Sequence, residues 1–359
     1  MTQEVYDLDR GTTIQNLLKA NGRPIPTTKE DPSSTVYHIK CDCGDSYIGE
    51  TSRLLPICGH EIELPKSEQD LVIVKDRGGK VYTLQRYDGV YYNSFYSVAH
   101  LKQIKGFKLR SDDVYFAGYL RTGTHWTYEM MSMLLRGKAE TAALWKGMNQ
   151  LEIVEAAALD ALPSPRILNT HFNLLHAPDD LKEKKCKIVY TLRDPRDVAV
   201  SLYNLSRSGS VVTNYTGDFK DYLYLFLEGK ADVNGYFNHM KSAEKYLQQH
   251  PDIPVLTVVY EEMLKNKLMA VEKLANFLGV PKNVDLIEAV VEKCQFSKMV
   301  VDKSAYTLKF SGENTIFRKG VSGDWKNWFT DELLEDYFRV YEEQMAGSRF
   351  YREEYGRQK

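Results

Sequence analysis

The chain from residue 112 onward alternates between short apolar runs and longer stretches with helical periodicity. Four apolar runs predict buried strands at residues 114–118, 166–169, 187–192 and 254–260. A stretch in which apolar residues recur every three or four positions follows each run. Strands that alternate with helices are typical of an α/β fold, so we expect a central parallel sheet flanked by helices.

The helical stretches show an apolar face and residues that are typical of a helix N-terminus. Trp126, Met130 and Leu134 recur at helical spacing after the first strand. Asp194 can cap a helix that starts at Pro195, directly after the third strand. These signals predict helices that begin at the carboxyl ends of the strands.

The N-terminal part of the chain has a different pattern. Residues 1–35 are polar and interrupted by prolines, which predicts a disordered segment. Residues 36–70 form a small N-terminal extension, and β-rich runs with the hairpin signals RGGKVY and RYDGVYY begin after it. We therefore expect one main domain over residues 71–359.

Composition and charge exclude a generally basic surface. The 359 residues are 43% apolar and 27% charged, with a formal net charge of −2. Because nucleic acid is bound by basic surfaces, we expect no nucleic-acid partner and only a local anion site. The start of the chain does not resemble a signal peptide, and no apolar run reaches the ~18 residues of a membrane helix. The five cysteines are not spaced as in a disulfide framework and fit reduced thiols, so we expect a cytoplasmic protein. We also expect no membrane partner.

A phosphate-binding loop is predicted at residues 118–126, GYLRTGTHW, where the first strand feeds a helix. Free backbone N–H groups at a helix N-terminus bind phosphate without any particular side chain. Gly123 allows close approach and Arg121 adds a permanent charge. Thr124 and His125 stand where a nucleoside-triphosphate loop needs Lys and then Ser or Thr. A structural turn with a solvated arginine is the alternative.

Two further stretches place polar side chains after strands. TLRDPRDVAVS has Arg193 at the end of the third strand and Ser201 eight residues later. RILNTHFNLL has His171 just past the second strand, at the edge where open α/β sheets bind ligands. A helix-face serine and a histidine hydrogen-bonded near a strand end are the alternatives.

A basic loop near the C-terminus reads FRKGVSGDWKNWFT. It places the cations of Arg318 and Lys319 beside the backbone N–H of Gly320. Two cations and a glycine N–H suit a phosphate monoester. A solvated basic loop is the alternative.

Together these four stretches resemble the cytosolic sulfotransferase family, in order and at the family's intervals, from about residue 80 to the C-terminus. The resemblance implies transfer of a sulfuryl group from 3′-phosphoadenosine 5′-phosphosulfate (PAPS) to a hydroxyl or amine of a small, hydrophobic acceptor. It implies that the loop at residues 118–126 is P-loop-like and wraps the phosphosulfate. It also implies that no metal is required.

The resemblance assigns roles to single residues. His171 matches the catalytic base, and Arg121 matches the residue that contacts the leaving phosphate oxygen. The aromatic faces of Trp126, Tyr260 and Phe296 suit the adenine ring, although Trp126 and Phe296 also fit a plain core. The positions expected to bind the donor are Arg121, Thr122, Gly123, Thr124, His125, Trp126, Arg193, Ser201, Tyr260, Cys294, Phe296, Arg318, Lys319 and Gly320.

Several positions depart from the family's pattern. Leu120 and Arg121 replace Pro-Lys, His125 replaces a Thr, and Cys294 replaces a Thr near the adenine. Asn169 replaces a lysine two residues before the catalytic histidine, so a cation expected near the sulfuryl group is missing. Each lost charge-assisted hydrogen bond costs about 1.5–3 kcal/mol if fully buried. A catalytically impaired nucleotide-binding protein of the same fold is therefore the alternative function.

A C-terminal segment resembles the family's dimer signature. Lys326, Thr330 and Glu335 fit it, whereas Asp331 stands in place of a valine. A homodimer is therefore left open, and the small-molecule acceptor is the one partner that we expect.

The N-terminal extension carries a separate resemblance. YHIKCDCGDSYIGETSR is similar to part of a GIY-YIG nuclease domain, so residues 36–70 fit a remnant of such a domain, and an exon artefact and a chance likeness are the alternatives. Cys41, Cys43, Cys58 and His60 offer zinc ligands at an uncommon spacing. Free thiols and a surface histidine are the alternative, and we predict no metal site.

Overall fold

A computed structural model describes most of the chain from Val36 onward. The predicted disordered segment 1–35 and all four candidate zinc ligands lie outside the residues it describes. Strands β1 (Val36–Lys40) and β2 (Ser46–Glu50) form an antiparallel pair in the N-terminal extension. The described residues are 36–40, 46–50, 71–93, 96, 98–142, 146–207, 215–304, 309–310, 313–314 and 316–357.

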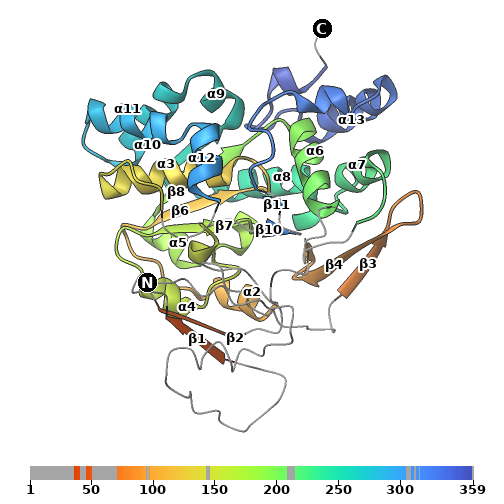
Figure 1. Cartoon of the computed structure of the whole chain (residues 1–359). Helices are drawn as coiled ribbons and strands as arrows, with labels where there is room; N and C mark the ends of the chain where they lie inside the picture. Colours follow the sequence, from red (N-terminus) through yellow and green to blue (C-terminus); the bar gives the residue numbers. More distant parts are fainter. Residues whose placement is uncertain are drawn as a thin grey trace, which may run out of the picture. The chain divides into compact units, whose positions relative to one another are not determined.

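Four parallel strands form the central sheet of the main domain, in the order β7-β6-β8-β9 (Figure 1). They are β6 (Val114–Gly118), β7 (Ile167–Thr170), β8 (Lys187–Leu192) and β9 (Val255–Val259). The predicted strands are confirmed within one residue at each end. The predicted α/β fold with a parallel sheet is confirmed as well.

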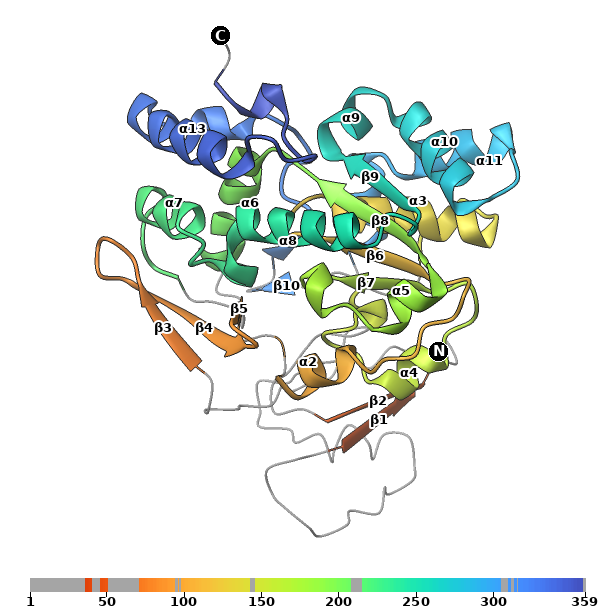
Figure 2. The ribbon, with the colours of Figure 1, turned by 180° about the vertical axis from the view of Figure 1, so that it is seen from behind.

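Helices cover both faces of this sheet. Helix α8 crosses in front of the strands in Figure 2, where α3 lies beyond them. The main helices are α3 (Thr124–Arg136), α6 (Pro195–Arg207), α8 (Gly235–Gln249), α10 (Lys267–Leu278), α11 (Val284–Lys293) and α13 (Asp331–Met345). The shorter helices are α2 (Val98–Ile104), α4 (Ala156–Asp160), α5 (Asp180–Lys184), α7 (Phe219–Leu227), α9 (Tyr260–Lys265), α12 (Phe296–Asp302) and the 3-10 turns η2 (Lys146–Asn149) to η6 (Glu353–Tyr355).

Side chains of β6 alternate between two apolar clusters, one on each face of the sheet. Val114 and Phe116 pack with residues of α3, α10 and α11. Tyr115 and Ala117 pack with residues of α6, α8 and α13. Because strand side chains point to opposite faces in turn, a strand that is covered on both faces is apolar throughout. This explains why the continuous apolar run of β6 predicts a buried strand.

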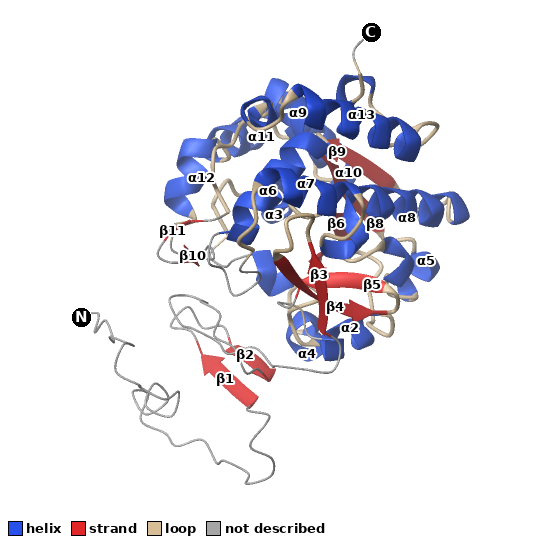
Figure 3. Ribbon diagram, turned by 90° about the vertical axis from the view of Figure 1, so that its right-hand side faces the viewer, coloured by secondary structure: helices blue, strands red, loops and turns tan. Residues whose placement is uncertain are grey.

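A separate antiparallel sheet precedes the parallel one. It consists of β3 (Leu71–Lys75), β4 (Val81–Tyr87) and β5 (Val90–Asn93), drawn as red strands in Figure 3. Asp88 and Gly89 connect β4 to β5 with φ angles of 47° and 76°. Two consecutive residues with positive φ are typical of a tight hairpin turn, so both hairpin signals are confirmed.

The signals at the start of α6 are also confirmed. The Oδ1 atom of Asp194 accepts a hydrogen bond from the backbone N–H of Arg196 at 2.9 Å, and the helix begins at Pro195. Asp194 also accepts from the Arg196 guanidinium at 2.7 Å. The cap fixes the direction in which the chain leaves β8, and hence where the following residues lie.

A buried ion pair ties together the starts of β6 and β7. Arg166 donates from Nε to Oδ1 of Asp113 at 2.8 Å and from Nη2 to Oδ2 at 2.6 Å, and neither side chain is exposed. The backbone N–H of Val114 donates to the carbonyl of Arg166 at 2.8 Å. The pair therefore fixes the relative position of the two strands whose other ends carry the predicted loop and base.

Removing this pair should destabilise the fold strongly. Arg166→Ala leaves the carboxylate of Asp113 buried and unpaired, which should lower the free energy of unfolding by about 3–5 kcal/mol. Arg339→Ala, which removes the exposed partner of Asp336, is the matched control and should have little effect. Urea titration followed by circular dichroism measures both changes, and equal losses would contradict the assignment.

Candidate functional site

A cavity of about 580 Å³ opens at the carboxyl ends of the parallel strands. From β6 the chain passes through α3 to β7 on one side, whereas from β8 it passes to β9 on the other. The strand order therefore reverses between β6 and β8. Open α/β sheets bind ligands at such a reversal, because the loops on its two sides diverge and leave a crevice.

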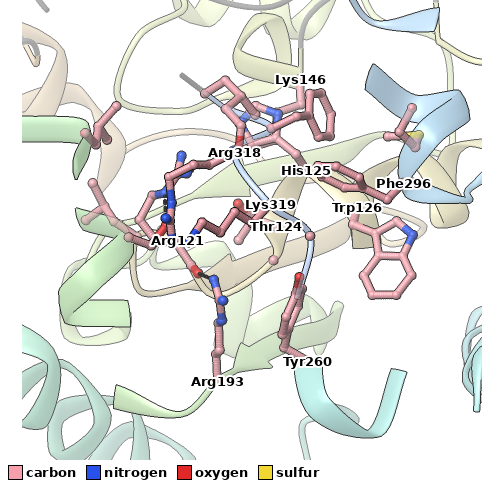
Figure 4. Close-up of a pocket in the computed structure, with 18 of the residues that line it drawn as sticks. Arg121, Thr124, His125, Trp126, Lys146, Arg193, Tyr260, Phe296, Arg318 and Lys319 are labelled. Atoms are coloured by element: carbon pink, nitrogen blue, oxygen red, sulfur yellow. Dashed lines mark hydrogen bonds between the residues drawn. The ribbon is translucent and has the colours of Figure 1, made fainter. Parts of the chain in front are cut away.

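The structure brings most of the predicted site residues together. All of them except Thr122 and Cys294 line the cavity, and Figure 4 shows side chains from well-separated segments around it. Arg121 comes from the loop after β6, Arg193 from the end of β8 and Arg318 from the C-terminal basic loop. Segments far apart in the sequence thus converge on one site.

The hydroxyl group of Thr122 does not face the cavity. Its Oγ1 atom donates to the carbonyl of Tyr119 at 2.6 Å and lies 2.7 Å from Oγ1 of Thr191. Thr122 is fully buried. The side chain therefore fixes the turn after β6, and a contact between Thr122 and the donor stays a prediction.

Cys294 lies behind the cavity. Its side chain is fully buried in the apolar cluster, with Sγ 3.9 Å from Sδ of Met133. Its backbone carbonyl accepts a hydrogen bond from Nε1 of Trp126 at 2.7 Å. Cys294 therefore positions the indole through its carbonyl, and a contact between Cys294 and the donor stays a prediction.

The loop after β6 requires glycine at position 123. Gly123 has a φ angle of 92°, in the left-handed region, and α3 begins at the next residue, Thr124. A Cβ atom at Gly123 would lie 2.7 Å from Cδ2 of Tyr260, too close for any side chain. The glycine therefore lets the start of α3 approach the ring of Tyr260, while Thr124 and its neighbours present their backbone to the cavity.

Positive charge is concentrated on one side of the cavity. Arg121 donates from Nε to Oγ of Ser201 at 2.9 Å, and Arg193 donates from Nη1 to the carbonyl of Arg121 at 3.1 Å. Burial, followed by the charges of Arg193 and Arg318, lowers the pKa of Arg121 to about 10. Cations that are held close enough to repel one another form a binding site for an anion.

The basic loop is held by two carboxylates. Asp324 accepts hydrogen bonds from Arg318 and Lys319, both at 2.6 Å. Burial alone would raise the pKa of Asp324, but these bonds hold it well below its usual value. Asp197, at the first turn of α6, accepts from the backbone N–H of Gly323 at 2.6 Å. Arg318 and Lys319 therefore belong to a loop that these hydrogen bonds organise, although Lys319 is exposed.

Three aromatic side chains also line the cavity, and one of them, Tyr260, packs against the Arg193 guanidinium, whose Cζ lies 4.3 Å from the ring centroid (Figure 4). The Trp126 and Tyr260 rings meet edge to face at 5.7 Å. Phe296 is 37% exposed, and a Cβ atom at Gly320 would lie 2.2 Å from its ring. Phe296 is therefore not plain core: its ring covers the glycine of the basic loop and faces the cavity, where a flat ligand ring can stack.

His171 lies just past the end of β7 and is nearly buried. Its Nδ1 atom is 2.8 Å from the carbonyl of Gly118, and because a carbonyl can only accept, Nδ1 carries the proton. Nε2 is then left as a hydrogen-bond acceptor. Burial, followed by the charge of Lys146, lowers the pKa of His171 well below its usual value. The ring is therefore neutral and its free nitrogen can take a proton.

Lys146 is a cavity residue that the sequence did not reveal. Its Nζ atom lies 3.0 Å from Oδ1 of Asn169 and 3.4 Å from Nε2 of His171. The expectation that no cation stands near position 169 is therefore wrong. The segment before η2 carries no strand-end motif, and its one sequence signal is a lysine among apolar neighbours in ALWKGM.

Comparison with known proteins gives the family. Residues 111–349 match the profile of the family described as "Sulfotransferase domain". The chain belongs to the sulfotransferase family. Sulfotransferase 1B1 of Canis lupus familiaris is 29% identical over 264 residues, which cover 69% of this chain and 88% of that protein. The amine sulfotransferase of Oryctolagus cuniculus is 27% identical over 258 residues, which cover 68% and 84%.

A solved structure agrees with this assignment. The crystal structure of mouse sulfotransferase SULT7A1 complexed with PAP is similar to this sulfotransferase, with a TM-score of 0.63 and 30% sequence identity. The similarity covers 74% of this chain and 95% of that one. The fold and the family therefore agree over the main domain.

The N-terminal extension lies outside the family match, which begins at residue 111. The nuclease resemblance of residues 36–70 gains no support from it. Among the residues that the structure describes in this sulfotransferase, no group of three or more His, Cys, Asp or Glu side chains could hold a metal ion. Every helix in the same described part is too short or too polar to cross a bilayer.

The stability of the protein should fall as the pH drops below about 6.5. Burial, followed by the charges of Lys146 and Arg121, lowers the pKa of His125 well below its usual value, so the unfolded chain takes up a proton that the folded chain does not. His125→Gln should reduce the loss by up to about 1.4 kcal/mol per pH unit. Denaturant titrations between pH 6.5 and 5.0 measure this, and an unchanged slope in the variant would contradict it.

Proposed function

We propose that this sulfotransferase moves a sulfuryl group from PAPS to a hydroxyl or amine of a small, hydrophobic acceptor, with His171 as general base. The observation that carries the proposal is the convergence of Arg121, Arg193, Arg318 and a neutral His171 on one cavity. The similar mouse enzyme was crystallised with PAP, which is PAPS without its sulfuryl group. The family, the anion site and the base therefore support the same chemistry.

The two charged ends of the donor fit two groups of residues. Arg193, Ser201, Arg318 and Lys319, with the backbone of Gly320, would hold the 3′-phosphate as charge-assisted donors. The loop from Arg121 to His125, at the start of α3, would hold the 5′-phosphosulfate. The rings of Trp126, Tyr260 and Phe296 would enclose the adenine, with Trp126 fixed by the carbonyl of Cys294.

The reaction needs alignment and charge stabilisation rather than a covalent intermediate. The acceptor oxygen or nitrogen attacks sulfur, and its proton passes to Nε2 of His171. The bond between sulfur and the 5′-phosphate oxygen breaks, and its electron pair remains on that oxygen. Arg121 and the backbone N–H groups of the loop would stabilise the charge that develops there.

The acceptor would lie beside His171, where the cavity is lined by both polar and apolar side chains. Tyr96, Gln150, Ile153 and Leu205 are among the side chains that line the cavity. Such a lining suits a small molecule with one reactive group and an apolar body. The homodimer and the cytoplasmic location stay predictions from the sequence.

Two substitutions should separate catalysis from donor binding. His171→Ala should lower kcat by about 10²–10⁴-fold and change the Kd for PAP little, because the base contacts the acceptor. Arg318→Ala should chiefly raise the Kd for PAP, because a phosphate contact is lost. Calorimetry with PAP and transfer of labelled sulfate to a panel of phenols, sterols and amines measure the two quantities.

Arg339→Ala is the matched control for the second variant, because Arg339 lies on the exposed side of α13. It should change neither quantity. Equal effects of the His171 and Arg318 variants on both quantities would contradict the assigned roles. Tight binding of PAP without any transfer would instead favour an impaired nucleotide-binding protein.

A further inference from the structure

A buried lysine stands beside the proposed base. Lys146 opens η2, is 2% exposed and lines the cavity. In Figure 4 it lies at the far end of the site from Arg193 and Tyr260. It is therefore remote from Arg193, and its contact with His171 places it close to where the acceptor and the sulfuryl group would meet.

Asn169, which lies on β7, accepts a hydrogen bond from this lysine. Its Oδ1 atom accepts from Nζ of Lys146 at 3.0 Å, while its Nδ2 atom donates to Oε1 of Gln150 at 3.2 Å. The two partners fix which way the amide points. The backbone is tied at the same position, since the N–H of Leu151 donates to the carbonyl of Asn169 at 3.0 Å. Asn169 is thus a positioning residue for the ammonium group.

The charge of Lys146 is incompletely neutralised within the described residues. No carboxylate there lies within ion-pair distance of Nζ, and the nearby Glu152 gives its Oε1 atom to the backbone N–H of His171 at 2.5 Å and to Thr170 at 2.7 Å. Burial lowers the pKa of Lys146 to about 7, which Glu152 opposes. His171 and His125 are the other titratable groups that respond to this ammonium. A buried cation in this position is stabilised by an anionic oxygen that enters the cavity.

The hydrogen-bond geometry leaves the ammonium able to make that contact. An ammonium group has three N–H donors, and Asn169 and His171 account for two of them in the described structure. The contact to Nε2 of His171 is long, at 3.4 Å. An anionic oxygen can therefore take the third donor and draw Lys146 away from Nε2, which leaves that nitrogen free for the acceptor proton.

We propose that Lys146 is a catalytic residue of the sulfuryl transfer, whose ammonium group contacts an oxygen of the transferring sulfuryl group while Asn169 positions it. The inference rests on the proposed function, because it requires the donor to be PAPS. Lys146 supplies from η2 the cation that position 169 lacks. The departure from the family's pattern at Asn169 is then compensated by Lys146 and is not a loss of the cation.

The step conserves protons and electrons without the lysine changing its charge. The acceptor oxygen forms the new bond to sulfur, and its proton goes to Nε2 of His171. The bond from sulfur to the 5′-phosphate oxygen breaks, and that oxygen keeps the electron pair. Lys146 remains protonated and stabilises the negative charge on the non-bridging sulfuryl oxygens.

Relocation of the cation tests the inference. Lys146→Met keeps an unbranched side chain of similar length without charge, and it should lower kcat by about 10²–10³-fold with the Kd for PAP changed less than threefold. Adding Asn169→Lys to that variant should restore at least a tenfold gain, because a lysine stem at position 169 starts beside the same point. A merely structural role of Lys146 predicts no such rescue. Unchanged kcat in Lys146→Met, or no gain in the double variant, would overturn the inference.

Proton uptake separates this inference from the proposed function. At pH 7.5, binding of PAPS without an acceptor should take up protons, because the sulfuryl oxygens raise the pKa of Lys146 from about 7; PAP should cause less uptake. Calorimetry in two buffers of different ionisation heat measures it, and Lys146→Met should abolish the difference between the ligands. If the wild type binds PAPS with this uptake but never transfers sulfate, the sulfuryl contact stands and the proposed function fails. If it transfers sulfate and the uptake is the same in Lys146→Met, the contact is overturned.

Discussion

Mutual repulsion among cations is the constraint around which the site is built. Arg121, Arg193 and Arg318 come from three segments, and burial, followed by the charges of the other two arginines, lowers the pKa of Arg121 to about 10. Hydrogen bonds to fixed acceptors hold them there, including the carbonyl of Arg121 and the carboxylate of Asp324. An anion with two charged ends removes this repulsion. Binding of the donor therefore offsets the unfavourable free energy of holding the cations close together.

The parallel sheet makes this gathering possible. All four strands end at the same edge, and the strand order reverses between β6 and β8, so the loops after these strands face one crevice. Segments that lie far apart in the chain meet there: Nη2 of Arg121 donates to the backbone carbonyl of Ile316, 195 residues later, at 3.2 Å. The glycines at positions 123 and 320 then let the loops approach the aromatic rings of Tyr260 and Phe296. Close backbone approach and charge convergence are thus two results of one topology.

The same cavity carries a second electrostatic arrangement at the base. His171 is kept neutral by burial and by the charge of Lys146, and its hydrogen bond to Gly118 leaves Nε2 available. A neutral base beside a cation suits a reaction in which a proton leaves the acceptor while negative charge stays on the transferred group. The departures from the family's pattern at the loop and at Asn169 therefore do not leave the site without charge.

The sequence by itself determined the local features: the parallel strands within one residue at each end, the cap at Asp194 and a set of site residues most of which line the cavity. These follow from periodicity, from capping chemistry and from motifs that are contiguous in the chain. Only the tertiary structure decided which way side chains point, and so it turned Thr122 and Cys294 away from the cavity. It also brought Lys146 to Asn169, a contact between segments 23 residues apart. A motif fixes the neighbours of a residue along the chain, whereas a site is made by neighbours in space.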